Sequence, residues 1–277
     1  MTWDAESFDR FERTGWQGRA DAYRDGFGRL AARFVEPLLD AAGVGAGSRV
    51  LDVGCGPGTV SAAALRRGAE VTAVDASPEM AALAARTHPG LAVRTALLDE
   101  LPFADGEFTA LVGNFVINHL GDPAAGLAEI RRVLAPGGRL ALTCWEKEAM
   151  RALALFGESV AESGVPYPDE VPLSGPFLAD STAPDRPTAF YRLLDEAGFA
   201  SADVETLRLL HRVDPGQWWS DVTDGTPLTG AVVSRLDPGS LAAVRRTYDR
   251  KVAAHAVGDG FVALPAVALL GSATRPE

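Results

Sequence analysis

One segment near the start of the chain limits its fold more than any other: VLDVGCGPGTVSAAALRRGAEVTAVDAS, from Val50 to Ser77. A short apolar run, VLDVG, leads into a glycine-rich turn, and a helical pattern then leads into a second apolar run, VTAVD. Two buried strands joined through a helix lie parallel in one sheet, because the crossover returns the chain to the same end of the sheet. The segment therefore predicts an α/β protein with a ligand at the turn between the first strand and the helix.

The glycine spacing separates two kinds of ligand. Gly54, Gly56 and Gly58 form GxGxG, whereas the fingerprint that holds the pyrophosphate of a dinucleotide has a glycine at the position of Thr59. Asp52, inside the first strand, would repel a pyrophosphate. Its carboxylate instead suits a cationic amine held through water or backbone groups. The turn therefore favours a ligand without phosphates.

The acidic end of the second strand indicates which ligand this is. Asp75 stands where a carboxylate can accept hydrogen bonds from both hydroxyls of a ribose. A ligand with a ribose, a cationic amine and no phosphate matches S-adenosylmethionine. A nicotinamide-linked oxidoreductase remains an alternative interpretation of the same turn.

The rest of the chain continues the alternation of strand and helix patterns. Strands are expected at LAVRTAL, FTALVGNF, RLALTCW, residues 204–212 and FVALPAVALLGSATR, and helices at SPEMAALAART, 122–134 and 190–199. This order predicts a doubly wound sheet with helices on both faces. Before it, apolar residues from Trp16 to Ala42 lie on one face of an expected helix. Two stretches interrupt the alternation: 146–188, expected as a helix and a long proline-rich loop, and 214–257, expected as helices.

Composition excludes several functional classes. The 277-residue chain has a formal net charge of -11 at pH 7, which would repel a phosphate backbone, so no nucleic-acid partner is expected. No apolar run is long enough to span a membrane. The beginning, MTWDAESFDRFERTG, lacks a secretory leader, and the two cysteines, Cys55 and Cys144, form no disulfide framework, which predicts a cytoplasmic protein. The histidines are far apart in sequence, so no metal site is expected.

Four motifs in order carry a resemblance to a known family. VLDVGCGPG, the acidic end of VTAVD, the segment LPFADGEF and the segment LAPGGRLAL resemble the successive motifs of class I S-adenosylmethionine-dependent methyltransferases, in the branch acting on small molecules and quinone-like acceptors. The resemblance implies a Rossmann-like, doubly wound seven-stranded sheet whose last strand is antiparallel. It also implies one structural domain with a helical lid at 1–48, a cofactor-binding core at 49–145 and the rest of the sheet at 146–277. Helical insertions at about 146–188 and 214–257 would bind the acceptor.

The resemblance also implies the cofactor contacts. Gly54, Cys55 and Gly56 would lie at the methionine end, Asp75 at the ribose, and Ala76 and Met80 beside the adenine. The family often has an acidic residue where this chain has Leu97, so the Leu98 N–H or a shifted Asp99 would read the adenine instead. The complete set expected around the cofactor is Tyr23, Asp52, Gly54, Cys55, Gly56, Gly58, Asp75, Ala76, Met80, Leu97, Leu98, Asn114, Phe115 and His119.

The ends of the fourth and fifth strands supply the residues that could meet the transferred methyl group. Asn114 and Phe115 either form a wall around it or pack as ordinary strand-end residues. His119 is a candidate general base, or else a residue that orients cofactor-proximal groups without doing chemistry. Trp145 faces either the acceptor or the core.

Aromatic residues elsewhere in the chain are candidates for the acceptor pocket. Trp16 and Tyr23, seven positions apart on the N-terminal segment, either pack on the sheet or close over the cofactor. Trp218 and Trp219 are neighbours on an expected helix and point about 100° apart, so at most one of them can line a pocket. The residues expected to bind substrate are Trp16, Phe115, Trp145, Trp218 and Trp219.

The sequence thus predicts methyl transfer from S-adenosylmethionine to a small, partly apolar acceptor in secondary metabolism, with S-adenosylhomocysteine as product. The alternative is a protein of the same fold that binds the cofactor but acts as a cyclase or assembles with a partner. The acceptor, the atom methylated (oxygen, nitrogen or carbon) and the oligomeric state stay open at this point.

Overall fold

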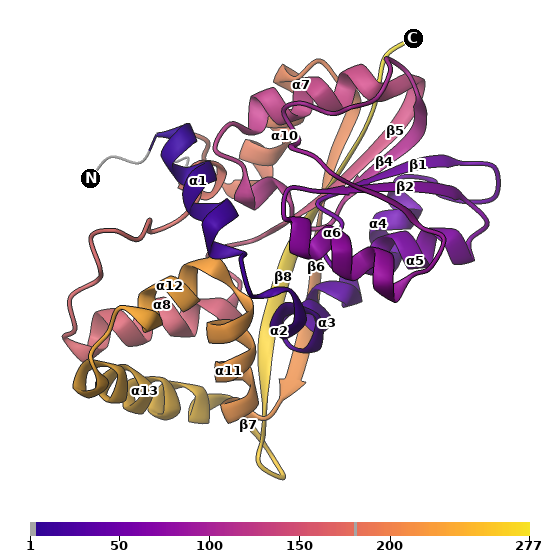
Figure 1. Cartoon of the computed structure of the whole chain (residues 1–277). Coiled ribbons are helices and arrows are strands. Elements are labelled where there is room, and N and C mark those ends of the chain that lie inside the picture. The colour runs from indigo at the N-terminus through magenta and orange to yellow at the C-terminus, as the bar shows by residue number, and fades with distance from the viewer. Residues whose placement is uncertain (1–3, 180–181) are drawn as a thin grey trace.

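A mixed β-sheet crosses the molecule, as the computed structural model shows for residues 4–179 and 182–277 (Figure 1). Its strands follow one another in the order β3 (Ala92–Thr95), β2 (Glu70–Asp75), β1 (Arg49–Val53), β4 (Phe108–Gly113), β5 (Leu134–Trp145), β8 (Phe261–Thr274) and β6 (Ala200–Val213). β8 is antiparallel to both of its neighbours, whereas β1 to β5 pair in parallel. This confirms the predicted doubly wound sheet with an antiparallel last strand. A three-residue strand that the sequence did not indicate, β7 (Ala256–Gly258), forms a hairpin with β8.

The helices alternate with these strands and fill the two predicted insertions. They are α1 (Ala5–Gly15), α2 (Ala20–Asp25), α3 (Gly28–Ala31), α4 (Val35–Ala41), α5 (Thr59–Arg66), α6 (Pro78–Thr87), α7 (Pro123–Val133), α8 (Arg151–Ser163), α9 (Pro176–Ala179), α10 (Arg186–Glu196), α11 (Pro215–Gly225), α12 (Pro227–Ser234) and α13 (Pro238–Val252), with short 3₁₀ turns η1 (Ala32–Phe34), η2 (Ile117–His119) and η3 (Ala253–His255). No helix in the described part of the chain is both long and apolar enough to cross a membrane.

Several helices start at a cap that can be read from the sequence. The predicted cap of α6 is present, because the Met80 N–H donates to the Ser77 hydroxyl and Pro78 occupies the first turn. α7, α11 and α13 begin in the same way, with an aspartate cap followed at once by proline. The proline needs no hydrogen bond at that position and its φ is already helical, so the pair fixes where each helix begins.

The expected single helix from Trp16 to Ala42 is wrong. The segment is divided into α2, α3, η1 and α4. The break lies at Gly26, whose φ of -118° and ψ of -105° are not helical, and at Gly28, where a Cβ atom would meet the Tyr23 carbonyl oxygen at 2.7 Å. Both glycines allow a bend, so that Tyr23 packs toward Met80 of α6 while Phe34 packs against Trp145.

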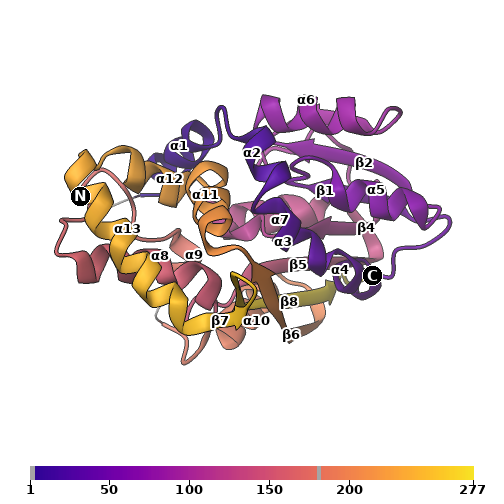
Figure 2. The same ribbon diagram turned by 90° about the horizontal axis from the view of Figure 1, so that it is seen from below.

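Helices cover both faces of the sheet, and a third group of helices packs beyond one end of it (Figures 1 and 2). α7 and α10 pack on one face through Leu127, Ile130 and Phe190, while α4, α5 and α6 pack on the other. α8, α11, α12 and α13 form a separate apolar core with the first half of β8. This third core lies beyond the carboxyl end of β5, next to the edge of the sheet where ligands bind in α/β proteins.

Trp218 is the largest fully buried side chain of the third core. It is fully buried, its ring stacks on Phe27 at 5.6 Å between centroids, and its indole N–H donates to the Ala152 carbonyl at 2.8 Å. The side chain therefore joins α11 to α8 and to the N-terminal segment, and its removal would leave a cavity.

We expect Trp218→Ala to lower the free energy of unfolding by about 3–5 kcal/mol, the usual cost of deleting a buried tryptophan. Urea denaturation followed by circular dichroism measures the change. The control is Tyr191→Ala, which removes a side chain that is 45% exposed and should cost less than about 0.5 kcal/mol. Equal losses in the two variants would contradict the assignment of Trp218 to the core.

Candidate active site

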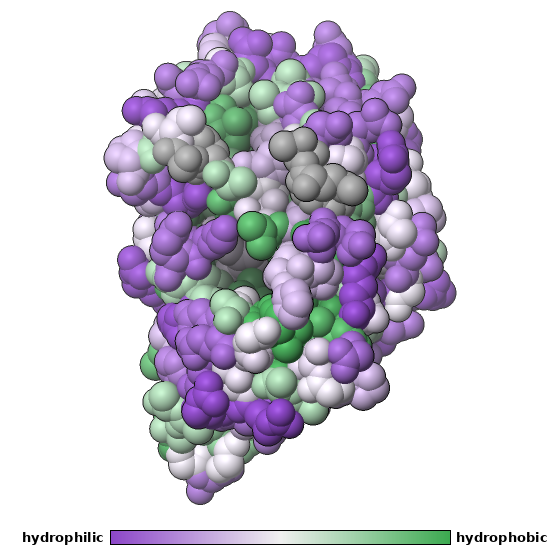
Figure 3. Space-filling view, turned by 90° about the vertical axis from the view of Figure 1, so that its left-hand side faces the viewer, coloured by the Kyte–Doolittle hydropathy of each residue, from purple (hydrophilic) through white to green (hydrophobic). Residues whose placement is uncertain are grey.

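A cavity of about 1010 Å³ lies at the carboxyl edge of the parallel strands. The ends of β1, β2, β4 and β5 form one side of it, and α1, α8, α11 and α12 form the other. On the face of the molecule that carries α1, hydrophobic residues gather around a hollow (Figure 3). Because the strands bring distant sequence motifs to one edge, the cavity collects most of the residues predicted from the sequence.

The glycine-rich turn and Asp75 are held together at this edge. Gly54 and Gly56 line the cavity with φ of +64° and +53°, a backbone region that side chains disfavour. A Cβ atom on Gly54 would also come within 2.5 Å of the Val116 side chain. The Asp75 carboxylate accepts from the Gly56 N–H and the Ser77 N–H, each at 2.8 Å. Burial raises the pKa of Asp75, and the two backbone donors offset part of that rise.

Other residues predicted for the turn lie behind it and not on the cavity. Asp52 is fully buried, accepts from the Ser61 hydroxyl at 2.5 Å, and has its pKa raised by burial to about 7. Burial likewise raises the pKa of the Cys55 thiol. Gly58, with φ of +86°, precedes α5 where a Cβ atom would meet the His88 ring at 2.7 Å. None of these three residues lines the large cavity, so their side chains support the turn from behind, and a role of each toward the cofactor stays a prediction.

The residues predicted beside an adenine do line the cavity. Ala76 and Met80 follow β2, and Leu97 and Leu98 follow β3. Asp99 lines it as well, so a backbone N–H and a carboxylate both stand near the position where an acidic residue was expected. The two alternatives for reading an adenine stay open.

The N-terminal segment closes over this half of the cavity. Trp16 and Tyr23 meet edge to face with ring centroids 5.3 Å apart, and both pack against the cluster around Met80. The Gly18 N–H donates to the Glu79 carboxylate at 2.6 Å, which ties the segment to α6. Both aromatic residues line the cavity, as expected for a lid.

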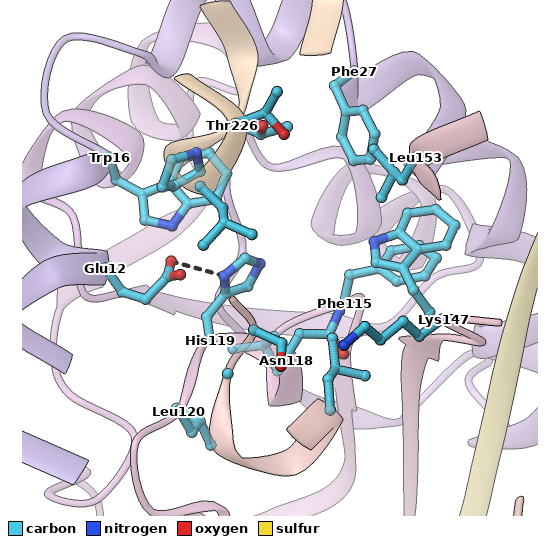
Figure 4. A pocket seen from close by; sticks show the side chains of 18 of the residues that line it. Glu12, Trp16, Phe27, Phe115, Asn118, His119, Leu120, Lys147, Leu153 and Thr226 are labelled. Carbon is cyan, nitrogen blue, oxygen red and sulfur yellow. Dashed lines mark hydrogen bonds and ion pairs between the residues drawn. The ribbon is translucent and has the colours of Figure 1, made fainter. Parts of the chain in front are cut away.

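His119 connects the lid to the sheet. Its Nδ1 lies 2.9 Å from the Glu12 carboxylate of α1, and its ring lies edge to face with Trp16 at 5.5 Å between centroids (Figure 4). Glu12 is only 6% exposed. Burial lowers the pKa of His119, but the charge and hydrogen bond of Glu12, with a smaller contribution from Asp75, raise it by more, so the imidazole pKa lies above its usual value. No sequence motif indicates Glu12, because it is 107 positions away from its partner along the chain.

An aromatic wall stands at the ends of β4 and β5. The Phe115 ring stacks on Trp145 with centroids 3.7 Å apart, and both residues line the cavity. Phe115 has a φ of +62°, an unusual conformation for a residue with a side chain. It is held by its N–H donating to the Thr143 hydroxyl, which in turn donates to the Asn114 amide oxygen at 2.8 Å. The strained backbone aims the Phe115 ring, and sequence reasoning did not identify Thr143 as its support.

Beyond this wall the cavity continues as an apolar chamber between α8 and α12. Residues that line it include Leu153, Ala154, Gly157, Leu228, Val232 and Val233. Of the two neighbouring tryptophans, Trp219 lines the chamber and stacks on Phe156 at 5.5 Å, whereas Trp218 does not line it. The expectation that at most one of them reaches a pocket is confirmed, and the expectation of Trp218 as a substrate contact is corrected, because its side chain is used in the third core.

Residues 51–142 match the family of the methyltransferase domain. A demethylmenaquinone methyltransferase of Beutenbergia cavernae is 43% identical over 102 residues, which cover 37% of this chain and 42% of that protein. An uncharacterised methyltransferase of Mycobacterium tuberculosis is 34% identical over 158 residues, which cover 56% of this chain and 63% of that protein. The matches thus span less than two thirds of either relative.

Solved structures agree on the fold. A candidate methyltransferase of Bacillus halodurans superimposes with a TM-score of 0.55 and 20% identity, over 88% of this chain and 99% of that one. At this identity the likeness concerns the fold alone. The family match lies within β1 to β5 and their connections, whereas α8 and α11 to α13, which enclose the apolar chamber, lie outside it.

The Glu12–His119 pair predicts a pH-dependent stability. Because the folded pKa of His119 is raised above 6.5, the pair contributes fully below about pH 6.5, and the contribution is lost as pH rises through the folded pKa. We expect Glu12→Gln to lower the free energy of unfolding by about 1 kcal/mol at pH 6 and by less at pH 9, a small value because solvent in the cavity screens the pair.

Urea titrations at both pH values measure this difference. Glu6→Gln is the control, since it removes the same charge from α1 at a side chain that is 82% exposed. A cost of Glu12→Gln that is the same at pH 6 and pH 9 would contradict the electrostatic coupling.

Proposed function

We propose that this chain, which carries a methyltransferase domain over residues 51–142, transfers a methyl group from S-adenosylmethionine to a small, partly apolar acceptor. The domain match confirms the class I methyltransferase family predicted from the sequence. The observation that carries the proposal is that one cavity joins the edge of the sheet at Asp75 to an aromatic, apolar chamber. One ligand can therefore lie along the sheet edge while a second lies in the chamber, in contact with the first.

The cofactor half suits a cationic sulfonium nucleoside. Carboxylates of Glu12, Asp75 and Asp99 line the cavity and would repel a pyrophosphate, whereas they favour a positive charge. A carboxylate offers about four acceptor sites, so Asp75 can hold the N–H groups of Gly56 and Ser77 and still accept from ribose hydroxyls. Gly54 and Gly56 present only backbone, which lets the amino-acid end of the cofactor approach closely.

For this reaction the protein has mainly to align the two reactants and to exclude water. S-adenosylmethionine supplies an activated methyl group, which passes to the acceptor by in-line displacement. Holding the two reactants in contact can supply about 7–11 kcal/mol of the barrier. The stacked rings of Phe115 and Trp145 and the lid residues Trp16 and Tyr23 are suited to that task, because they enclose the cavity with apolar surface.

His119 is better suited to fastening the lid than to removing a proton. Its Nδ1 is engaged by Glu12, and its raised pKa keeps the imidazole protonated to higher pH, which leaves less free base near neutrality. We therefore assign His119 a positioning role.

The acceptor is proposed to have a bulky apolar body. The chamber between α8 and α12 is lined mainly by leucine, valine, alanine and glycine. The name of the Beutenbergia relative specifies a demethylmenaquinone, which is compatible with such a chamber. A role in secondary metabolism is part of the same proposal.

Native mass spectrometry of the purified protein tests the function directly. A bound mass equal to S-adenosylmethionine or S-adenosylhomocysteine is expected. Product mass then separates the alternatives: an acceptor heavier by one methyl group supports transfer, and an unchanged mass with cofactor bound supports the cyclase or partner-binding alternative.

Asp75→Ala should weaken binding of S-adenosylmethionine by about 1.5–3 kcal/mol, or roughly 10- to 150-fold, because a charge-assisted contact to the ribose is lost. Isothermal titration calorimetry on the folded variant measures the affinity. Asp195→Ala is a matched control that removes an exposed carboxylate of α10, away from the cavity, and should leave the affinity unchanged. Unchanged affinity in Asp75→Ala would remove this residue from the ribose site.

His119→Ala should weaken cofactor binding and, at saturating cofactor, lower the rate by less than about tenfold, because the residue holds the lid and does not take part in the chemical step. A general base would instead give a loss of about 10²–10⁴ in the chemical step that shrinks as pH rises above the acceptor pKa. Single-turnover rates at saturating cofactor between about pH 6 and pH 10 distinguish the two. Rescue of the variant at alkaline pH would show that His119 is the base.

A further inference from the structure

We propose that Arg19 is a positioning residue that couples the two halves of the cavity. Through Arg19, a molecule in the apolar chamber strengthens binding of the cofactor under the N-terminal segment, and the cofactor strengthens binding in the chamber. The inference rests on the proposed function and adds to it a residue that regulates the same site. Arg19 was not among the residues that the sequence singled out.

Residues 15–23, here called the strap, run between the two groups of helices that enclose the cavity. α2, which begins in the strap, lies between α11 on the acceptor side and α6 on the cofactor side (Figure 2). Trp16 and Tyr23 of the strap line the cavity. A change in the position of the strap therefore affects both halves of the cavity.

Arg19 fastens the strap to the acceptor side. Its guanidinium group donates to the Thr223 carbonyl at 3.0 Å and to the Asp224 carbonyl at 2.6 Å, and its Nε–H donates to the Gly15 carbonyl at 2.8 Å. Thr223 and Asp224 stand in the last turn of α11, where the carbonyls have no partner within the helix. A positive charge is also favoured at this end of a helix. Arg19 thus caps α11 from the strap.

The wall of the chamber packs directly on the strap at the same place. A Cβ atom on Gly230 of α12 would lie 2.6 Å from the guanidinium carbon of Arg19, and a Cβ atom on Gly15 would lie 2.7 Å from the Pro227 Cβ. Pro227 begins α12 and lines the cavity, as does Leu228. Because close-packed groups leave no slack, a shift of this wall is passed to the strap.

The next residue along the chain fastens the strap to the cofactor side. The Gly18 N–H donates to the Glu79 carboxylate of α6 at 2.6 Å, and Trp16 and Tyr23 pack against Met80. One planar peptide unit therefore separates the bond to α6 from the side chain that holds α11. Arg19 itself does not line the cavity, so it can influence a ligand only through the strap.

These contacts give a physical reason for coupling. A ligand in either half restricts the strap through the cavity wall that it touches. The second ligand then meets a strap that is already ordered, so it loses less conformational entropy on binding. The coupling is reciprocal, because each ligand must change the affinity of the other by the same factor.

A neutral apolar fluorescent probe, N-phenyl-1-naphthylamine, tests the proposal without the natural acceptor. It is titrated into the full chain with and without saturating S-adenosylhomocysteine, and the ratio of the two dissociation constants measures the coupling. The natural chain should bind the probe about five- to twentyfold more tightly when S-adenosylhomocysteine is present. In Arg19→Gln this ratio should fall below about twofold.

Arg24→Gln is the matched control. It removes an arginine of α2 whose ion pairs, with Asp21 and Asp25, stay within the same segment, so the ratio should not change. Arg19→Lys keeps the charge but not the planar fork that reaches two carbonyls, so its ratio should lie between those of the natural chain and Arg19→Gln. This milder variant decides the test if Arg19→Gln does not fold. A merely structural arginine would lower the free energy of unfolding and leave the ratio as it is.

The proposal is overturned if the natural chain binds the probe equally well with and without S-adenosylhomocysteine, if Arg19→Gln keeps the ratio, or if Arg24→Gln lowers it as much. A chamber that does not bind the probe would also overturn it.

Failure of the proposed function gives a different result, in which S-adenosylhomocysteine does not bind at all. Hydrogen exchange of residues 15–23 then decides the inference. The probe alone should slow exchange of the strap in the natural chain and not in Arg19→Gln, whereas equal slowing in both would show that Arg19 does not couple the chamber to the strap.

Discussion

The carboxylate of Asp75 fixes the part of the molecule around which the whole site is arranged. It accepts from the Gly56 N–H of the turn after β1 and from the Ser77 N–H that begins the connection to α6. Two parallel strands are thereby joined at their carboxyl ends by one charged group, in addition to their ladder of backbone bonds. Because the group is buried, the hydrogen bonds are strong and their loss is costly. These hydrogen bonds hold the turn with its glycines in the left-handed conformation, and the turn lines the cavity.

The cavity has two halves with different physical origins. The proposed cofactor half is built from strand ends and turns of the sheet, where β1, β2 and β4 meet. The proposed acceptor half is built from helices that have their own apolar core around Trp218, Tyr248 and the first half of β8. The family match covers residues 51–142, whereas α8 and α11 to α13 lie outside it.

The lid is held by polar contacts placed around an apolar centre. Glu12 meets His119, Asp9 accepts from the Gly121 N–H, and Glu79 accepts from the Gly18 N–H. Trp16 and Tyr23 pack between these contacts. Because these contacts are few, they can be broken and remade at modest cost, as the proposed lid requires.

The sequence by itself determined the order of strands and helices, the parallel sheet, the cap of α6 and the glycine-rich turn with its acidic partner, because each depends on residues close together along the chain. Only the tertiary structure decided that the segment from Trp16 to Ala42 bends at Gly26, that Trp218 enters the core while Trp219 reaches the chamber, and that Asp52 stays behind the turn. It also brought Glu12 to His119 across 107 positions. Local sequence patterns indicate which face of a helix or strand is apolar. Contacts between distant segments depend on how the elements pack, and a short stretch of sequence carries no signal of that packing.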